Sequence, residues 1–186
     1  MTAKKRMILM MGGQGVGKGA CSRALMANGK YKHVETGAIL RSMPPDSDIA
    51  KTISAGNLVT DDMLFDIMKS EIDTDSDIIL DGFPRKISQA KWLVDNYSDI
   101  FEIYALYLSV PTEIMIQRIN KRNREGGKRI DDSSPEIIQK RIDTYFQMTM
   151  PAIEWLRNCS CVHFSEIDAS GDINDNLANI MMALGK

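Results

Sequence analysis

The sequence predicts a three-layer α/β/α fold, in which a five-stranded parallel sheet lies between two layers of helices. Short, continuously apolar runs such as Ile78-Ile79-Leu80 are typical of strands that are covered on both faces. Segments with helical spacing of apolar residues separate these runs along the chain. A glycine-rich turn directly follows the first run, Met7–Met11. Ligands of such sheets bind beyond the carboxyl ends of the strands.

The first half of the chain has clear boundaries between its expected elements. These are a strand over 7–11, a helix over 18–27, a strand at 33–34, and helices over 37–42, 48–55 and from 61 onward. Asn28-Gly29 is a typical helix end. Prolines at 44–45 break the chain after the helix over 37–42. Thr60 is expected to cap the next helix, with Asp61 and Asp62 in its first turn.

The second half continues the alternation of strands and helices. It contains strands over 78–80, 103–110 and 161–164, and helices over 86–96, from Pro111, from the Ser133–Glu136 region and over 173–184. Ser133 and Glu136 have the spacing of a capping box. Ile138, Ile142, Tyr145 and Phe146 form the apolar stripe of the helix that follows, and Pro151 should kink it.

Length and composition indicate one globular domain over residues 1–186. The 44% hydrophobic and 26% charged residues are ordinary, and a net charge of −2 gives no reason to expect nucleic acid or a membrane as partner. No stretch approaches the length of a transmembrane helix. The 3 cysteines suggest a reducing compartment, so we expect a cytoplasmic monomer. No cysteine–histidine set has the spacing of zinc ligands.

The glycine-rich turn Gly12-Gly13-Gln14-Gly15-Val16-Gly17-Lys18 matches the pattern G-x-x-x-x-G-K of a P-loop. Glycines allow a tight turn whose N–H groups point inward and cradle phosphate. The helix that begins near Lys18 adds its positive dipole end, and Lys18 adds an ammonium group. The serine or threonine that normally follows the lysine is absent. The turn therefore predicts binding of a nucleoside triphosphate.

Arginines are concentrated between residues 118 and 141. They are Arg118, Arg122, Arg124, Arg129 and Arg141. Arg118 and Arg122 share a helix face, and a polar, glycine-containing loop over 123–128 follows them. By itself such a charge run favours a solvated connection. Beside a phosphate loop, it favours a mobile segment whose guanidinium groups bind phosphate oxygens.

Several segments, in order over nearly the whole chain, resemble the adenylate kinase branch of the nucleoside monophosphate kinases. They are Gly12–Ala20, Thr36-Gly37-Ala38-Ile39-Leu40-Arg41, Gly56–Asp61, Asp81-Gly82-Phe83-Pro84-Arg85 with Gln89, and Arg129-Ile130-Asp131-Asp132 with Arg141. The family also has glycine after the lysine of its loop. The resemblance implies Mg²⁺-dependent, reversible phosphoryl transfer from ATP to AMP, which gives two ADP.

The resemblance also implies roles for individual residues. ATP would be bound by Gly13, Gln14, Gly15, Val16, Gly17, Lys18, Gly19, Ala20 and Arg122. AMP would be bound by Thr36, Gly37, Arg41, Leu58, Val59, Gly82, Arg85, Gln89, Arg129 and Arg141. Lys18, Arg85, Arg122, Arg129 and Arg141 would be catalytic. Asp81 would hold Mg²⁺ through water. A monophosphate-binding insert would cover 36–70, and a short lid without zinc would cover 122–132.

The chain departs from the family pattern at Gln14, Ala20 and Ala38, where the family has proline, threonine and an acidic residue. Loss of one neutral hydrogen-bond donor at Ala20 should slow turnover about tenfold at most. The departures leave two alternatives open. One is a kinase for another monophosphate (UMP, CMP or dAMP), and the other is a weakly active regulatory module that binds nucleotides.

Overall fold

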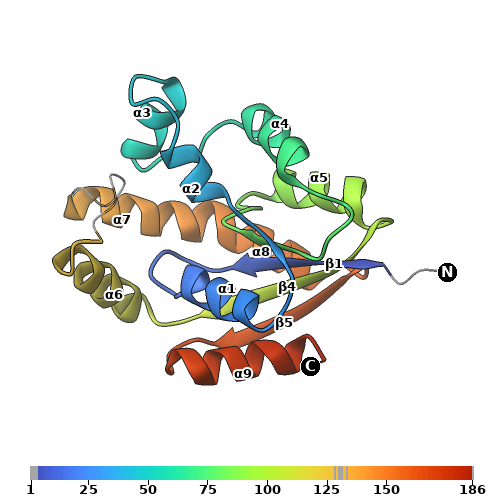
Figure 1. The fold of residues 1–186 in the computed structure, drawn as a ribbon. Coiled ribbons are helices and arrows are strands. Elements are labelled where there is room, and N and C mark those ends of the chain that lie inside the picture. Colours follow the sequence, from blue (N-terminus) through green and yellow to red (C-terminus); the bar gives the residue numbers. More distant parts are fainter. Residues whose placement is uncertain (1–3, 128, 130–131, 133, 186) are drawn as a thin grey trace.

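The computed structural model describes residues 4–127, 129, 132 and 134–185, and it contains a parallel sheet flanked by helices (Figure 1). The strands are β1 (Lys5–Met11), β2 (Lys32–Glu35), β3 (Ile78–Asp81), β4 (Phe101–Ser109) and β5 (Val162–Asp168). They form a five-stranded sheet in the order β2-β3-β1-β4-β5, and every recorded pairing is parallel. The predicted α/β fold is confirmed.

Helices lie on both faces of this sheet (Figure 1). They are α1 (Lys18–Ala27), α2 (Thr36–Arg41), α3 (Asp48–Ser54), α4 (Asp61–Glu71), α5 (Ile87–Tyr97), α6 (Thr112–Arg124), α7 (Pro135–Thr144), α8 (Met150–Arg157) and α9 (Ile173–Ala183). Helices α1 and α9 pack together on one face, and α5 and α8 pack together on the other. Among the described residues, no helix is both long enough and apolar enough to span a membrane.

The central strands form the core because their side chains are apolar on both faces. Met7, Ile8 and Leu9 of β1 are fully buried, as are Ile78 and Ile79 of β3. A strand enclosed by neighbours on both edges and by helices on both faces has no polar face. Continuous apolar runs were therefore sufficient to locate these strands from the sequence.

One predicted helix start needs correction, and a second is confirmed in position. Helix α7 begins at Pro135 with Ser134 as its N-cap, and the Ser134 side chain accepts a hydrogen bond from the N–H of Ile137. The capping box predicted for Ser133 is therefore wrong by one residue, and Ser133 itself lies outside the described residues. Thr60 occupies the N-cap of α4 as predicted, but its side chain makes no capping hydrogen bond.

A π-helical turn, η2 (Tyr145–Thr149), joins α7 to α8. Pro151 has no N–H to donate within a helix, so the backbone in front of it widens instead of continuing as an α-helix. The structure thus has a π turn in front of Pro151, where the sequence predicted a kink. The extra residue also changes which side chains face inward. Tyr145 is buried as predicted, whereas Phe146 is 48% exposed, so its predicted place in the apolar stripe is wrong.

The elements that bear the predicted site gather at the carboxyl edge of the sheet. The segment α2–α4 is inserted between β2 and β3, and its helices lie to one side of the sheet in Figure 1. Helices α6 and α7 lie at the same end of the molecule, at the left of the view. The loop between β1 and α1 opens between these two groups of helices.

Candidate active site

A cavity of about 360 Å³ lies at this edge of the sheet, a volume typical of ligand sites. Its walls come from the β1–α1 loop, the ends of β2 and β3, the α2–α4 insert, and helices α6 and α7. The charged side chains that line it are Lys18, Arg23, Glu35, Arg41, Asp81, Arg85, Arg118, Arg122, Arg129 and Arg141. Cations outnumber carboxylates in this set, so the cavity is suited to a strongly anionic ligand.

The β1–α1 loop takes a shape that requires glycine. Gly12, Gly15 and Gly17 have φ angles of 132°, 80° and 105°, which side chains rarely allow. A Cβ atom on Gly12 would lie 2.5 Å from the carbonyl oxygen of Leu108, and one on Gly15 would lie 2.6 Å from that of Met115. The loop therefore packs directly against the backbone behind it. Gly17 is the N-cap of α1 and turns the loop into the helix.

Lys18 is folded into this loop. Its Nζ donates hydrogen bonds to the carbonyl oxygens of Gly12 at 2.8 Å and Gly13 at 2.6 Å. Its pKa is lowered from 10.5 to about 8, with burial as the largest cause; Asp81 opposes the shift, and the nearby arginines contribute to it. A bound polyphosphate would add negative charge and favour the ammonium form. The lysine therefore has the position and the charge needed to bind phosphate.

Asp81 ends β3 and is buried in the wall of the cavity, 6% exposed. Burial raises its pKa, Lys18 opposes this shift, and the carboxylate of Glu35 adds to it. A carboxylate oxygen here is a hard donor of the kind that Mg²⁺ and its water shell prefer. The donor chemistry of Asp81 thus fits the metal that the sequence implies.

Two predicted catalytic arginines share one buried carboxylate. Asp132, whose side chain is fully buried, pairs with Arg122 at the end of α6 and with Arg141 of α7. Helices α6 and α7 are thereby joined across the short segment between them. One carboxylate offsets only one of the two positive charges, so the pair keeps a net positive charge toward the cavity. Sequence reasoning assigned Asp132 no role of its own, although it belongs to the quoted R-x-D-D segment.

On the acceptor side, Arg41 and Arg85 line the cavity in different ways. Arg41 is 3.0 Å from Glu35, measured from Nη2 to Oε1. The Nε of Arg85 donates to the carbonyl oxygen of Gly82 at 2.8 Å, which holds the guanidinium beside the loop after β3. Gly37, Leu58 and Gly82 also line the cavity, as predicted for the acceptor site.

Other predicted acceptor residues lie behind the cavity wall. Gln89 is fully buried, and its amide is already satisfied. Its Oε1 accepts the N–H of Arg85 at 2.7 Å, and its Nε2 donates to Oδ1 of Asp61 at 2.9 Å. Thr36 and Val59 are buried as well. These residues, together with Gly13 and Val16 of the loop, are not part of the lining surface, although the remaining predicted residues are.

Arg118 was not among the predicted site residues, yet it connects three parts of the site. Its guanidinium donates to the carbonyl oxygens of Val16 at 3.1 Å, Ala169 at 3.0 Å and Ser170 at 3.3 Å. It therefore ties α6 to the phosphate loop and to the segment after β5. The sequence indicated Arg118 only as one of the arginines concentrated between residues 118 and 141, and its contacts required the fold.

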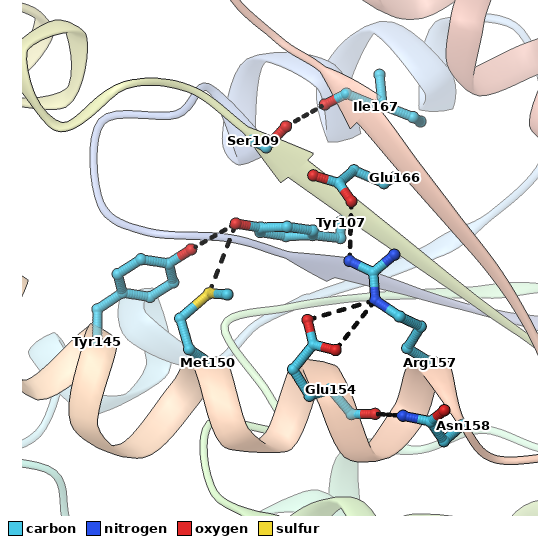
Figure 2. A network of polar contacts seen from close by, with 9 residues as sticks. All are labelled: Tyr107, Ser109, Tyr145, Met150, Glu154, Arg157, Asn158, Glu166 and Ile167. Atoms are coloured by element: carbon cyan, nitrogen blue, oxygen red, sulfur yellow. Dashed lines mark hydrogen bonds and ion pairs between the residues drawn. The ribbon is translucent and has the colours of Figure 1, made fainter.

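A pair of tyrosines lies beside the β1–α1 loop. The hydroxyl groups of Tyr107 and Tyr145 are 3.1 Å apart, and the Tyr107 hydroxyl also lies 3.5 Å from the Met150 sulfur (Figure 2). A Cβ on Gly13 would lie 3.4 Å from the Tyr145 ring. Burial, followed by the bond to Tyr107, raises the pKa of Tyr145. The sequence indicated only that Tyr145 is apolar core, and its hydroxyl contact required the fold.

A glycine-rich loop that encloses a lysine, at the carboxyl edge of a sheet with the order 2-3-1-4-5, defines a P-loop phosphotransferase of the nucleoside monophosphate kinase type. The comparisons with known proteins are more specific. The model of the family described as "Adenylate kinase" matches residues 10–160. The chain belongs to the adenylate kinase family.

Individual relatives agree over almost the full length. The chain is 33% identical to an adenylate kinase of Prochlorococcus marinus subsp. pastoris, over 95% of this chain and 96% of the relative. It is 31% identical to one from Bacteroides thetaiotaomicron, over 96% and 98%, respectively. It is 28% identical to adenylate kinase isoenzyme 1 of Sus scrofa, over 95% and 93%. The similarity thus spans both bacterial and animal enzymes.

Proposed function

We propose that the cavity around Lys18 and the arginines is where this chain carries out the reaction of its family. That reaction, and the function of this chain, is reversible phosphoryl transfer from ATP to AMP, which gives two ADP. The observation that carries the assignment to this cavity is its lining. One continuous cavity contains both the phosphate loop of a donor site and two arginines suited to a second phosphate, Arg41 of the inserted segment and Arg85 after β3.

The mechanism depends on position and charge. Phosphoryl transfer requires little covalent help from the protein, because its transition state is stabilised by alignment and by charge on the equatorial oxygens. Lys18 and the loop N–H groups would bind the β- and γ-phosphates of ATP. Arg122, Arg129 and Arg141 would surround the transferred group, and Arg41 and Arg85 would bind the acceptor phosphate. Such guanidinium groups bind phosphate oxygens in pairs.

Asp81 would hold the water shell of Mg²⁺. When bound, the ion would supply positive charge that offsets the negative charge of the phosphates. The support for this role is the buried carboxylate of Asp81 in the cavity wall, close enough to Lys18 to affect its pKa. Ala20 provides no hydroxyl beside this position. The Asp81 carboxylate is therefore the main oxygen donor that we assign to the hydrated ion.

The organisation of the chain follows from the same proposal. Residues 1–186 would form one kinase domain, with a monophosphate-binding insert over 36–70 and a short lid over 122–132. A lid must exclude water, because otherwise ATP would be hydrolysed rather than transferred. We place the protein in the cytoplasm as a monomer. The free thiols of Cys21, Cys159 and Cys161 support a reducing compartment.

Turnover measured with a panel of monophosphates tests the function. We expect ADP formation with AMP to exceed that with UMP, CMP or dAMP.

Lys18→Ala should reduce kcat about 100-fold or more, since it removes a preorganised charge at the transferring phosphate. Arg85→Ala should raise the KM for AMP much more than that for ATP. Equal loss for both substrates would contradict the role of Arg85, and absence of ADP formation with every acceptor would refute the function.

A further inference from the structure

Glu35 is the last residue of β2, and it brings a carboxylate into a cavity otherwise dominated by cations. Among the described residues that line the cavity, Glu35 and Asp81 are the only acids. The two stand opposite each other in the parallel pairing of β2 and β3. Asp81 is buried close to Lys18, whereas the Glu35 side chain is 27% exposed and faces the arginines.

Glu35 is paired with arginines from two different parts of the site. Its Oε1 is 3.0 Å from Nη2 of Arg41 and 3.8 Å from Nη2 of Arg129. Arg41 belongs to α2 of the insert, and Arg129 belongs to the segment between α6 and α7. One carboxylate oxygen therefore bridges the two groups of elements that face each other across the cavity. No other described acid in the cavity lining makes such a bridge.

We propose that Glu35 is a built-in competitor of the acceptor phosphate. This inference rests on the proposed function, in which both arginines bind the phosphoryl groups of the substrates. Before the acceptor binds, the Glu35 carboxylate pairs with Arg41 and Arg129, and the acceptor phosphate has to compete with it for their N–H groups. Glu35 thus holds the ligand-free protein in a form that binds the acceptor less well. The apparent affinity for the acceptor falls in proportion to the fraction of molecules in this form.

The consequence for specificity is that Glu35 penalises anionic acceptors in particular. A phosphate brings negative charge close to the carboxylate, whereas a nucleoside without phosphate does not. Displacement of Glu35 also releases Arg129 from β2.

Glu35→Gln tests the proposal, because glutamine keeps the shape and an acceptor oxygen but removes the charge. Binding is measured by titration calorimetry with AMP, adenosine, ATP and Mg-ATP, each added alone. We expect the variant to bind AMP about fivefold more tightly, the scale of a partly exposed ion pair. The affinity for adenosine should stay unchanged, and the affinity for Mg-ATP should change less than that for AMP, because Arg129 is farther from Glu35 than Arg41 is. In turnover assays the KM for AMP should fall more than the KM for ATP.

Glu166→Gln is the matched control. Glu166 lies on β5, where its carboxylate pairs with Arg157 at 2.8 Å, and it is not part of the cavity lining. The substitution removes the charge of this carboxylate. The control should bind AMP as the unaltered protein does. Should Glu35→Gln fail to fold, Glu35→Asp carries the same test. It withdraws the carboxylate by one methylene, and AMP binding should tighten about twofold.

Each remaining outcome decides the matter. Unchanged or weaker AMP binding by the folded variant would overturn the proposal and make Glu35 a support for Arg41. Weaker Mg-ATP binding with unchanged AMP binding would also overturn it and assign the carboxylate to the cation. If the unaltered protein binds ATP but takes up no AMP, the proposed acceptor site itself fails, and this inference fails with it.

Discussion

Lys18 illustrates how a single residue is adjusted by its surroundings. The loop carbonyls of Gly12 and Gly13 accept its N–H groups, yet burial and the neighbouring guanidinium groups disfavour its charge. The net effect is a pKa of about 8, well below the ordinary 10.5. The site therefore contains a lysine that is charged at neutral pH but close to its titration point.

This pKa predicts the pH dependence of ATP use. In the free enzyme, kcat/KM for ATP should fall as pH rises through about 8, because Lys18 loses its proton there. Lys18→Arg keeps a permanent charge, so its smaller kcat/KM should stay level over the same range. Steady-state profiles between pH 6.5 and 9.5 measure both. A parallel fall in the arginine variant would show that another group titrates.

The lowered pKa of Lys18 should also make the free energy of unfolding depend on pH. Between about 8 and 10.5 the unfolded chain binds a proton at Lys18 that the folded chain has lost. The contribution of this group to the free energy of unfolding therefore rises with pH across that window. Urea unfolding of the unaltered protein and of Lys18→Met would isolate it. The difference in stability between the two proteins should shift toward the unaltered one as pH increases.

At the scale of elements, α6 and α7 are connected through one buried group. The carboxylate of Asp132 meets Arg122 near the end of α6 and Arg141 in α7. A fully buried carboxylate is tolerated only with such partners, since an unpaired charge in the interior is very unfavourable. The two helices therefore present their arginines to the cavity from a common anchor.

Asp132→Asn should be costly for both stability and catalysis. Removal of one charge from a buried network leaves its partners uncompensated, and we expect the free energy of unfolding to fall by about 3 kcal/mol. Turnover should drop more than tenfold at saturating substrates, because Arg122 and Arg141 lose their fixed positions. Urea unfolding and initial rates provide the two readouts.

Asp143→Asn is the control for this prediction, because Asp143 lies exposed on α7 and accepts a hydrogen bond from Gln139. Its stability should change by no more than about 0.5 kcal/mol. Wild-type turnover in Asp132→Asn would show that the two arginines do not depend on that carboxylate.

At the scale of the whole molecule, charge is distributed unevenly. The chain carries a net charge of −2, yet among the described residues the cavity is lined by one lysine and a larger group of arginines with only two acids. Negative charge elsewhere on the surface balances this concentration. Nucleotides should thus be attracted locally to a protein that would otherwise repel them weakly.

Ionic strength should separate this local attraction from stability. Between about 20 mM and 500 mM NaCl, the affinity for ATP should fall several-fold, because salt screens the cavity charges. The affinity for adenosine should hardly change over the same range. Equilibrium titrations with both ligands measure the contrast, and a thermal unfolding scan at each salt concentration checks that the fold is intact. An equal salt effect on both ligands would argue against electrostatic attraction at the cavity.

The sequence was informative where local chemistry decides structure. The buried strands could be recognised as apolar runs, and the phosphate loop as glycines followed by a lysine, because each feature depends on residues that are adjacent in the sequence. Glu35 was not predicted, and Arg118 was expected only as one of several arginines near phosphate, because their contacts come from strands and loops that meet only in the fold. Phe146 was misplaced because helical periodicity assumes 3.6 residues per turn, and the π turn does not obey it.

The π turn at Tyr145–Thr149 lies between α7 and α8 and sets the rotation of one helix relative to the other. Each residue in an α-helix advances the direction of side chains by about 100°. Deleting one residue from the turn would therefore rotate everything before it by roughly that angle relative to α8. With Ile153 anchored in the core, Arg141 would swing away from the nucleotide cavity. The additional residue in the π turn therefore determines whether the guanidinium group of Arg141 faces the cavity.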